Sequence, residues 1–307
     1  MVPAPDPRPR RRRRWPSLCA VCVLGTAAWF AFADDRGPSG PRPLVGGVAV
    51  SGDGTLLELL IPEQVAEFYT QQRDPRHPLL HAPVEGRLRI DGGAEQRIDL
   101  HARGNNSATR ADKSLTLDLR RTTRITPLLQ LQRCYLLNLA FDPHRIETRL
   151  CTDWLGDLGL FPARTVFVRL VVNGDYQGPF LLVERPRDAI RREHRGVVSV
   201  LRTTRKGHEV RWNRKGVDPR LILKELEAAH TVGDADERAA RFARLVDVEA
   251  LCGWVAFNSL VRNADSVDEL FLFEVRRTDD ELGRLGLMGW DYDDLMSPAA
   301  HPDFVLE

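Results

Sequence analysis

The chain has 307 residues, 43% of them hydrophobic and 28% charged, with a formal net charge of +1 at pH 7. This composition excludes a disordered chain, a collagen-like repeat and a multi-span membrane protein. Residues 1–33 carry six Arg and one Asp, so the rest of the chain is net negative. A net negative body argues against a dedicated nucleic-acid-binding protein.

The N-terminus has the pattern of a targeting segment. Six arginines within residues 8–14 precede an uncharged run from Pro16 to Ala33. As a helix this run is about 27 Å long, close to one hydrocarbon thickness, and Ala31-Phe32-Ala33 suits a signal peptidase. A cleaved signal peptide and an uncleaved membrane anchor both remain open. Either one predicts an extracytoplasmic body, anchored or secreted, joined to residues 1–33 by a linker at residues 34–44.

The first part of the body, about 45–184, has the patterns of an antiparallel sheet. Alternating or short apolar runs predict five or six strands. Asn173-Gly174-Asp175 is typical of a tight hairpin. A helix is expected to begin at Pro143 and end at Gly159. The predicted strands are Val84–Ile90, Gln96–Ala102, Ser114–Arg120, Cys134–Ala140, Thr165–Val172 and Pro179–Val183, and the helix has one apolar face formed by Ile146, Leu150, Trp154, Leu155 and Leu158.

The second part, about 185–307, has mainly helical patterns. Helices are expected over Pro186–His194, Pro219–His230 and Asp236 to about Arg262. Two strands, Leu270–Val275 and Leu285–Met288, close this part just before an acidic loop. Such a loop after a strand is a common place for reactive groups.

Three short motifs contain residues suited to phosphoryl-transfer chemistry. The loop Arg103-Gly104-Asn105-Asn106-Ser107 precedes Lys113, and backbone N–H groups followed by a Lys suit phosphate oxygens. By itself this pattern is more typical of a hairpin loop with a solvated Lys. No P-loop, dinucleotide-binding, zincin or nucleophile-elbow motif is present in the sequence.

The other two motifs are acidic. Asp265, in Asn263-Ala264-Asp265, is placed to orient or deprotonate a hydroxyl, although a solvated turn Asp is an alternative. Asp291 and Asp293 are separated by one residue after an apolar strand, and their oxygens suit Mg²⁺ or Ca²⁺. An acidic exposed turn is the alternative there.

These motifs together resemble the spore-coat protein H (CotH) kinase family. The resemblance covers residues 84–296, and the blocks that carry it follow the family's order: Arg-Gly-Asn-x-Ser…Lys (103–113), Leu-Leu-x-Leu-x-x-Asp-Pro (136–143), Asn-Gly-x-Tyr-x-Gly-x-x-Leu-Leu-x-Glu (173–184), Asn-x-Asp (263–265) and Trp-Asp-Tyr-Asp (290–293).

The resemblance implies an α+β, atypical protein-kinase-like bilobal fold over 45–307, with a sheet-rich first lobe and a mainly helical, shortened second lobe. It implies ATP and Mg²⁺ as cofactors and a protein partner with Ser/Thr acceptors. The site residues it implies are Asp265 as catalytic Asp, Lys113 on the nucleotide phosphates with Arg103, Gly104, Asn105 and Ser107 in the preceding loop, Glu184 near the adenine, and Asp291 as metal ligand with Asp293 and Glu269.

The chain departs from the family pattern at two points. Asp268-Glu269 stands where the family usually has a metal-binding Asn, and the sequence ends fourteen residues after Asp293. An inactive surface binding or adhesion module therefore remains an alternative to an active extracytoplasmic kinase. A metal-dependent phosphoesterase that uses Asp291 and Asp293 is a third, weaker reading.

Overall fold

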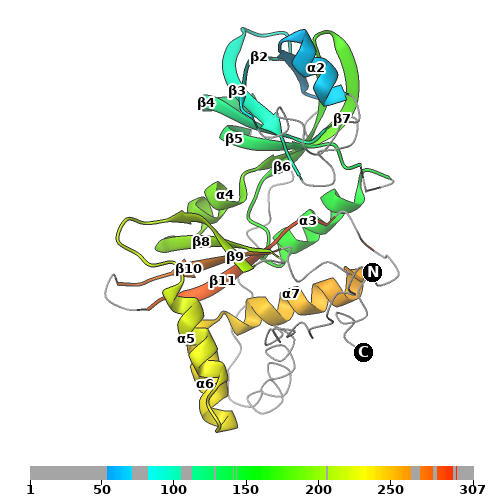
Figure 1. The fold of residues 1–307 in the computed structure, drawn as a ribbon. Coiled ribbons are helices and arrows are strands. Elements are labelled where there is room, and N and C mark those ends of the chain that lie inside the picture. Colours follow the sequence, from blue (N-terminus) through cyan, green and yellow to red (C-terminus); the bar gives the residue numbers. More distant parts are fainter. Residues whose placement is uncertain are drawn as a thin grey trace, which may run out of the picture.

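A computed structural model describes residues 54–70, 82–104, 113–127, 129–140, 142, 144–204, 207–263, 270–278, 282–292 and 295. Figure 1 shows a barrel at the top, a smaller sheet below it and helices around that sheet. The helices are α2 (Glu63–Thr70), α3 (Glu147–Asp157), α4 (Pro186–Glu193), α5 (Leu221–His230), α6 (Ala235–Leu245) and α7 (Val248–Val261).

Seven strands form the closed barrel in the order β1-β2-β3-β4-β5-β7-β6. Neighbours pair antiparallel except at the closure, where β1 pairs parallel with β6 and Leu57 lies opposite Leu170. The closed circle leaves no strand edge unpaired in this sheet. The strands are β1 (Leu56–Leu60), β2 (Val84–Ile90), β3 (Gln96–Ala102), β4 (Leu115–Thr126), β5 (Leu129–Leu137), β6 (Thr165–Val172) and β7 (Asp175–Glu184).

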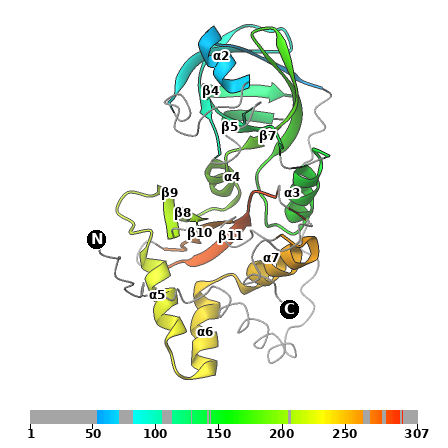
Figure 2. The same cartoon turned by 45° about the vertical axis from the view of Figure 1, so that its right-hand side comes forward.

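The second sheet has four strands in the order β11-β10-β8-β9. They are β8 (Val197–Thr204), β9 (Gly207–Asn213), β10 (Leu270–Val275) and β11 (Arg284–Gly289). All their pairings are antiparallel. Helix α4 lies between this sheet and the barrel, whereas α5 and α6 extend away from the barrel (Figures 1 and 2).

Strand β7 joins the two hydrophobic cores because its side chains alternate between them. Phe180 and Leu182 are buried with the core inside the barrel. Leu181 and Val183 are buried with a second core that includes residues of α3, α4, α7 and the four-stranded sheet. A single strand with both faces buried therefore holds the barrel against the rest of the molecule.

The predicted bilobal kinase-like fold with a mainly helical second lobe is wrong. The first part is a closed seven-stranded barrel rather than five or six strands, and the second part contains a four-stranded sheet. The closure joins β1 to β6 more than 100 residues later. Strand β8 pairs with β10 about 70 residues later. Local hydrophobic periodicity predicts single strands but not which distant strands pair with each other.

Two helix predictions also needed correction. The run Asp236–Arg262 is two helices, because Val246 forms a β-bridge with Leu285 and Asp247 caps α7 by accepting a hydrogen bond from Ala250 N–H. The apolar face predicted on α3 is not a buried face: only Leu155 of that set is fully buried, and the other four side chains are 44–58% exposed. Of the other two predicted helices, α4 starts at the predicted Pro186 and α5 starts two residues after the predicted Pro219.

No helix among the described residues is long and apolar enough to cross a membrane. The predicted targeting segment, residues 1–33, and the linker at 34–44 lie outside the described residues.

Candidate functional site

Two motifs that are far apart in the sequence meet where the barrel faces the second sheet. The Arg103 guanidinium, just after β3, lies 3.7 Å from the centroid of the Tyr135 ring and 5.2 Å from that of Trp290. Arg202 of β8 approaches the Asp291 carboxylate to 3.9 Å. Burial lowers the pKa of Arg103, and the nearby Asp291 carboxylate partly opposes that shift. The loop after β3 and the loop after β11 therefore share one charged cluster.

The backbone around Asp291 is fixed by its neighbours. Trp290 and Tyr292 are 2% and 1% exposed, and Asp291 between them has a φ of 64°. An Asp tolerates this left-handed conformation better than most residues. Trp290 lies parallel to Phe161 at a centroid distance of 6.2 Å. With both neighbours buried, the Asp291 side chain points toward the basic cluster.

The 136–143 block holds the Asp291 loop indirectly. The buried Asp142 carboxylate accepts hydrogen bonds from the backbone N–H groups of His144 (3.2 Å) and Thr148 (3.0 Å), at the start of α3. The Thr148 hydroxyl then donates to the Tyr292 carbonyl at 2.9 Å. Asp142 thus positions a helix, and the helix positions the loop that contains Asp291.

Two asparagines of the family blocks also have positioning contacts. Asn173 accepts from Ile61 N–H at 2.9 Å and donates to Ile61 C=O at 2.8 Å, which fixes the chain between β1 and α2. Asn263 donates to the Asn258 side chain at 3.0 Å, and Asn258 donates to the Trp254 carbonyl. The end of α7 is thereby held two residues before Asp265.

The structure places Lys113 and Glu184 in the interior. Lys113 is 2% exposed, with its ammonium 4.9 Å from the centroid of the Phe68 ring on α2. Both Glu184 carboxylate oxygens accept from Arg192 of α4, at 3.2 and 3.0 Å, and one also accepts from Arg164 N–H. Glu184 thus forms a buried ion pair at the junction where it was predicted to face the adenine.

A cavity of about 250 Å³ lies in the junction beside Arg103. Among the described residues, its walls contain five guanidinium groups and no carboxylate. They also include two aromatic rings, and α4 and the β8–β9 hairpin supply most of the remaining wall. The lining residues are Arg103, Tyr135, Arg185, Pro186, Arg187, Arg202, Val210, Arg211 and Phe271. Guanidinium groups only donate hydrogen bonds, so the walls suit an anionic ligand rich in acceptors.

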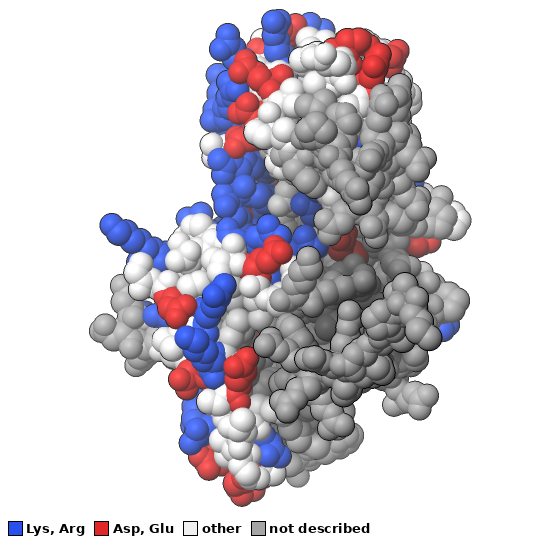
Figure 3. All heavy atoms as spheres, viewed as in Figure 1, with Lys and Arg blue, Asp and Glu red and all other residues white. Residues whose placement is uncertain are grey.

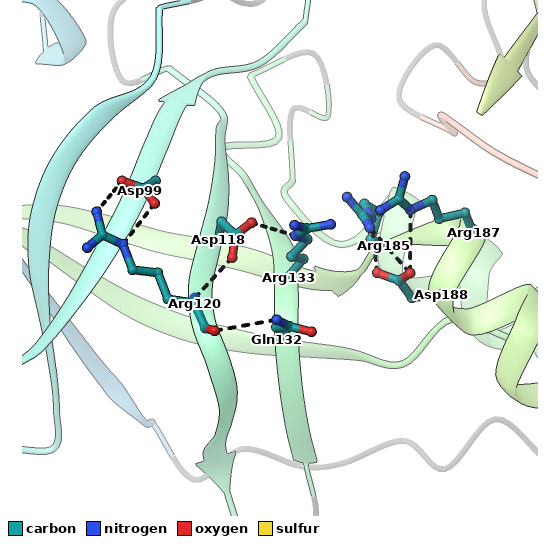
Figure 4. Close-up of polar contacts among 8 residues, drawn as sticks. All are labelled: Asp99, Asp118, Arg120, Gln132, Arg133, Arg185, Arg187 and Asp188. Carbon is teal, nitrogen blue, oxygen red and sulfur yellow. Dashed lines mark hydrogen bonds and ion pairs between the residues drawn. The ribbon is translucent and has the colours of Figure 1, made fainter. Parts of the chain in front are cut away.

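The basic character extends from the cavity over the neighbouring barrel surface. Figure 3 shows a column of Lys and Arg atoms along the left side of the barrel and down to the junction. Figure 4 shows Asp99, Arg120, Asp118 and Arg133 in alternation across β3, β4 and β5, with Arg185, Arg187 and Asp188 at the start of α4. The barrel arginines are therefore largely paired.

Four of the cavity arginines could not be recognised as site residues from the sequence. Only four of the 44 basic residues are lysines, so Arg185, Arg187, Arg202 and Arg211 did not stand out among the other arginines. Arg185 and Arg187 flank Pro186, which opens α4. Pro at the first helical position was the one local signal that placed them at a helix start.

The described residues provide few metal ligands. They contain no group of three or more His, Cys, Asp and Glu side chains placed to hold a metal ion. Asp291 is the single predicted metal ligand among them. Asp293, Glu269 and the catalytic candidate Asp265 lie outside the described residues, as do Asn105 and Ser107 of the phosphate loop, whereas Gly104 is described and has a φ of 93°.

A family model described as CotH kinase protein matches residues 100–302, about two thirds of the chain. No curated protein matches the chain. The matched range includes all five cavity arginines, which lie in the loop after β3, at the start of α4 and on β8 and β9, together with Asp291.

Proposed function

The chain belongs to the CotH kinase protein family, and from this membership we propose that it is a kinase that transfers the γ-phosphoryl group of ATP to a Ser or Thr hydroxyl of a secreted or surface protein. Family membership supports a kinase-like protein that uses a nucleotide. The observation that carries the proposal is the meeting of Arg103 and Arg202 with Asp291 beside a cavity whose described lining contains five arginines.

The side chains at this place fit a nucleotide. Arg103 and Arg202 offer donors to phosphate oxygens, and Tyr135 and Phe271 add aromatic surface to the same walls. ATP, when bound, supplies the phosphoryl group that is transferred. Arg103 and Arg202 bind and orient its phosphates in this proposal, and Asp291 lies beside Arg202.

The described residues do not by themselves fit a magnesium ion. Asp291 is one oxygen ligand, it lies 3.9 Å from the competing Arg202, and Mg²⁺ in proteins usually needs further carboxylates or substrate phosphates. No step of the reaction is therefore assigned to the metal. Magnesium dependence through Asp291, Asp293 and Glu269 stays a prediction.

Asp265 is the residue we propose to accept the proton of the acceptor hydroxyl, or to orient that hydroxyl. The support is local and indirect. The hydrogen bonds of Asn263 and Asn258 fix the chain at the end of α7, immediately before Asp265.

ATP binding is tested by thermal unfolding of the full-length chain. A ligand that binds only the folded state stabilises it by RT ln(1 + [L]/Kd), about 2.7 kcal/mol at a hundredfold excess over Kd. We expect ATP to raise Tm, more strongly with Mg²⁺, and Arg202→Gln to remove most of the shift. Arg241→Gln, which changes an exposed arginine of α6 paired with Glu237, is the matched control. An unchanged Tm at millimolar ATP would exclude the nucleotide.

An inactive binding module is the second candidate. It is favoured by the interior positions of Lys113 and Glu184, which tie two predicted nucleotide residues to the barrel and to Arg192. Radiolabelled ATP separates the two functions: a Tm shift without phosphate incorporation into the chain or a Ser/Thr-rich test protein supports the module.

The extracytoplasmic location is a proposal that depends on the N-terminal pattern of Arg cluster and uncharged run. We expect a reporter that is active only after export to function when it is joined after residue 60. A second reporter, active only in the cytoplasm, is the control at the same position. Activity of that cytoplasmic reporter alone would contradict export.

A further inference from the structure

The arginines of the cavity fall into two groups by their contacts. Arg103 and Arg202 belong to the cluster around Asp291 and Trp290. The other three, Arg185, Arg187 and Arg211, come from the start of α4 and from β9, and are called the outer arginines below. Only the first group is used by the proposed nucleotide site.

The outer arginines are held close to one another. Arg187 donates from Nη1 to the Arg211 carbonyl at 3.3 Å. The Asp188 carboxylate lies 2.9 Å from Arg185 Nε and 3.5 Å from Arg187 Nε. Burial lowers the pKa of Arg187, and the positive charges of Arg185 and Arg133 lower it further. Three guanidinium groups therefore gather at the cavity, and Figure 4 shows Arg133 of the barrel beside Arg185 and Arg187.

This group has a weakly used donor and excess positive charge. Within the described residues, the buried Nε–H of Arg187 makes no hydrogen bond, and an Asp188 oxygen lies 3.5 Å from this nitrogen. In the same part of the chain, the three outer arginines and Arg133 pair with three carboxylates, Asp118, Asp188 and Glu209, which leaves one positive charge. A phosphate monoester is negative at neutral pH, opposite in sign to this excess.

The outer arginines also adjoin a sheet edge. Strand β9 is the end strand of the second sheet and, among the described residues, pairs with β8 alone. It is largely exposed, and two of its residues, Val210 and Arg211, line the cavity. The unpaired backbone of an edge strand binds extended peptides by adding a strand.

We propose that the outer arginines and the edge of β9 form a docking site for an extended protein segment that carries a phosphorylated Ser or Thr. The phosphate lies among Arg185, Arg187 and Arg211, and the segment runs along β9. That this segment belongs to the acceptor protein rests on the proposed kinase function. The docking itself does not depend on turnover.

The test is fluorescence anisotropy with the full-length chain and a labelled ten-residue Gly/Ser peptide that has one central phosphoserine. We expect its Kd to be at least about tenfold lower than that of the same peptide without phosphate, because a charge-assisted hydrogen bond contributes about that factor. Arg187→Gln and Arg211→Gln should each raise Kd about tenfold. Arg187→Lys should recover only part of the loss, since Lys keeps the charge without the planar fork.

Arg241→Gln on α6 is the control and should leave Kd unchanged, and equal Tm values show that the variants are folded. Free O-phosphoserine should bind at least about tenfold more weakly than the peptide, because it lacks the backbone that pairs with β9. Equal binding of phosphorylated and unphosphorylated peptides, or of free O-phosphoserine and peptide, would overturn the proposal. Competitive displacement of the peptide by ATP would overturn it too, by assigning the outer arginines to the nucleotide.

The failure of docking and the failure of the kinase function are distinguishable. Phosphopeptide binding without phosphate transfer from ATP leaves the docking site in place and removes the kinase function. Phosphate transfer to a Ser/Thr-rich protein with no preference for phosphopeptide removes the docking site alone.

Discussion

Asp265→Asn is expected to lower kcat by a factor on the order of 10²–10⁴ and to leave the dissociation constant of ATP nearly unchanged. A group that orients or deprotonates the acceptor hydroxyl acts chiefly in the transition state, so its loss reduces turnover more than ground-state binding. Radiolabelled phosphate transfer gives kcat, and calorimetric titration gives Kd. The exposed Asp236→Asn on α6 is the matched control.

Asp291→Asn should behave differently from Asp265→Asn, and the two roles proposed for Asp291 predict opposite signs. If Asp291 binds Mg²⁺, its loss weakens ATP binding in the presence of the metal. If Asp291 only pairs with Arg202, removing its negative charge strengthens ATP binding whether or not Mg²⁺ is present. Titrations with and without Mg²⁺ decide between them. A fall in ATP affinity on Asp265→Asn with none on Asp291→Asn would reverse the assignments.

Arg192→Ala is expected to have the largest effect on stability, about 3 kcal/mol off the free energy of unfolding. It leaves the Glu184 carboxylate, whose side chain is 6% exposed, without its ionic partner. The figure is at the low end for a broken buried pair, because the Arg192 side chain is 31% exposed. Urea denaturation measures the change.

Two further variants test whether the loss of stability comes from the unpaired Glu184 carboxylate or from lost packing of the Arg192 side chain. Glu184→Gln combined with Arg192→Ala should recover part of the stability, because a neutral amide is less costly to bury than an unpaired carboxylate. Arg241→Ala, which breaks an exposed pair with Glu237, should cost no more than about 0.5 kcal/mol. An Arg192→Ala loss no larger than that of Arg241→Ala would show that Glu184 does not depend on Arg192.

In the proposed reaction, the two groups of cavity arginines bind different reactants. Arg103 and Arg202 lie with Asp291, where the proposal places the phosphates that are given up. The outer arginines lie toward α4 and the exposed β9, where the acceptor segment is proposed to bind. ATP and the acceptor segment would then enter the same cavity from different walls. Binding both reactants in one place lowers the entropic cost of bringing the reacting groups together.

The family and many of the elements follow from local patterns along the chain. All six strands predicted in the first part overlap a barrel strand over most of their length, and β2, β3 and β6 have the predicted bounds. Their alternation of apolar and polar residues is a local property that follows from one buried face. Arg103 and Asp291 stood out in the sequence because they belong to short motifs, and a motif, like a strand pattern, can be recognised along the chain.

Tertiary structure decided which residues share the junction. The barrel closes through a parallel pair of β1 and β6, and β8 finds its partner in β10, so neither sheet is visible in a local pattern. Four of the five cavity arginines were hidden among the other arginines of the chain, and they become a group only when α4 and the β8–β9 hairpin pack beneath the barrel. Charge acts over distances of a few ångströms in space rather than along the sequence, so an anion site built from separate elements appears only in the folded chain.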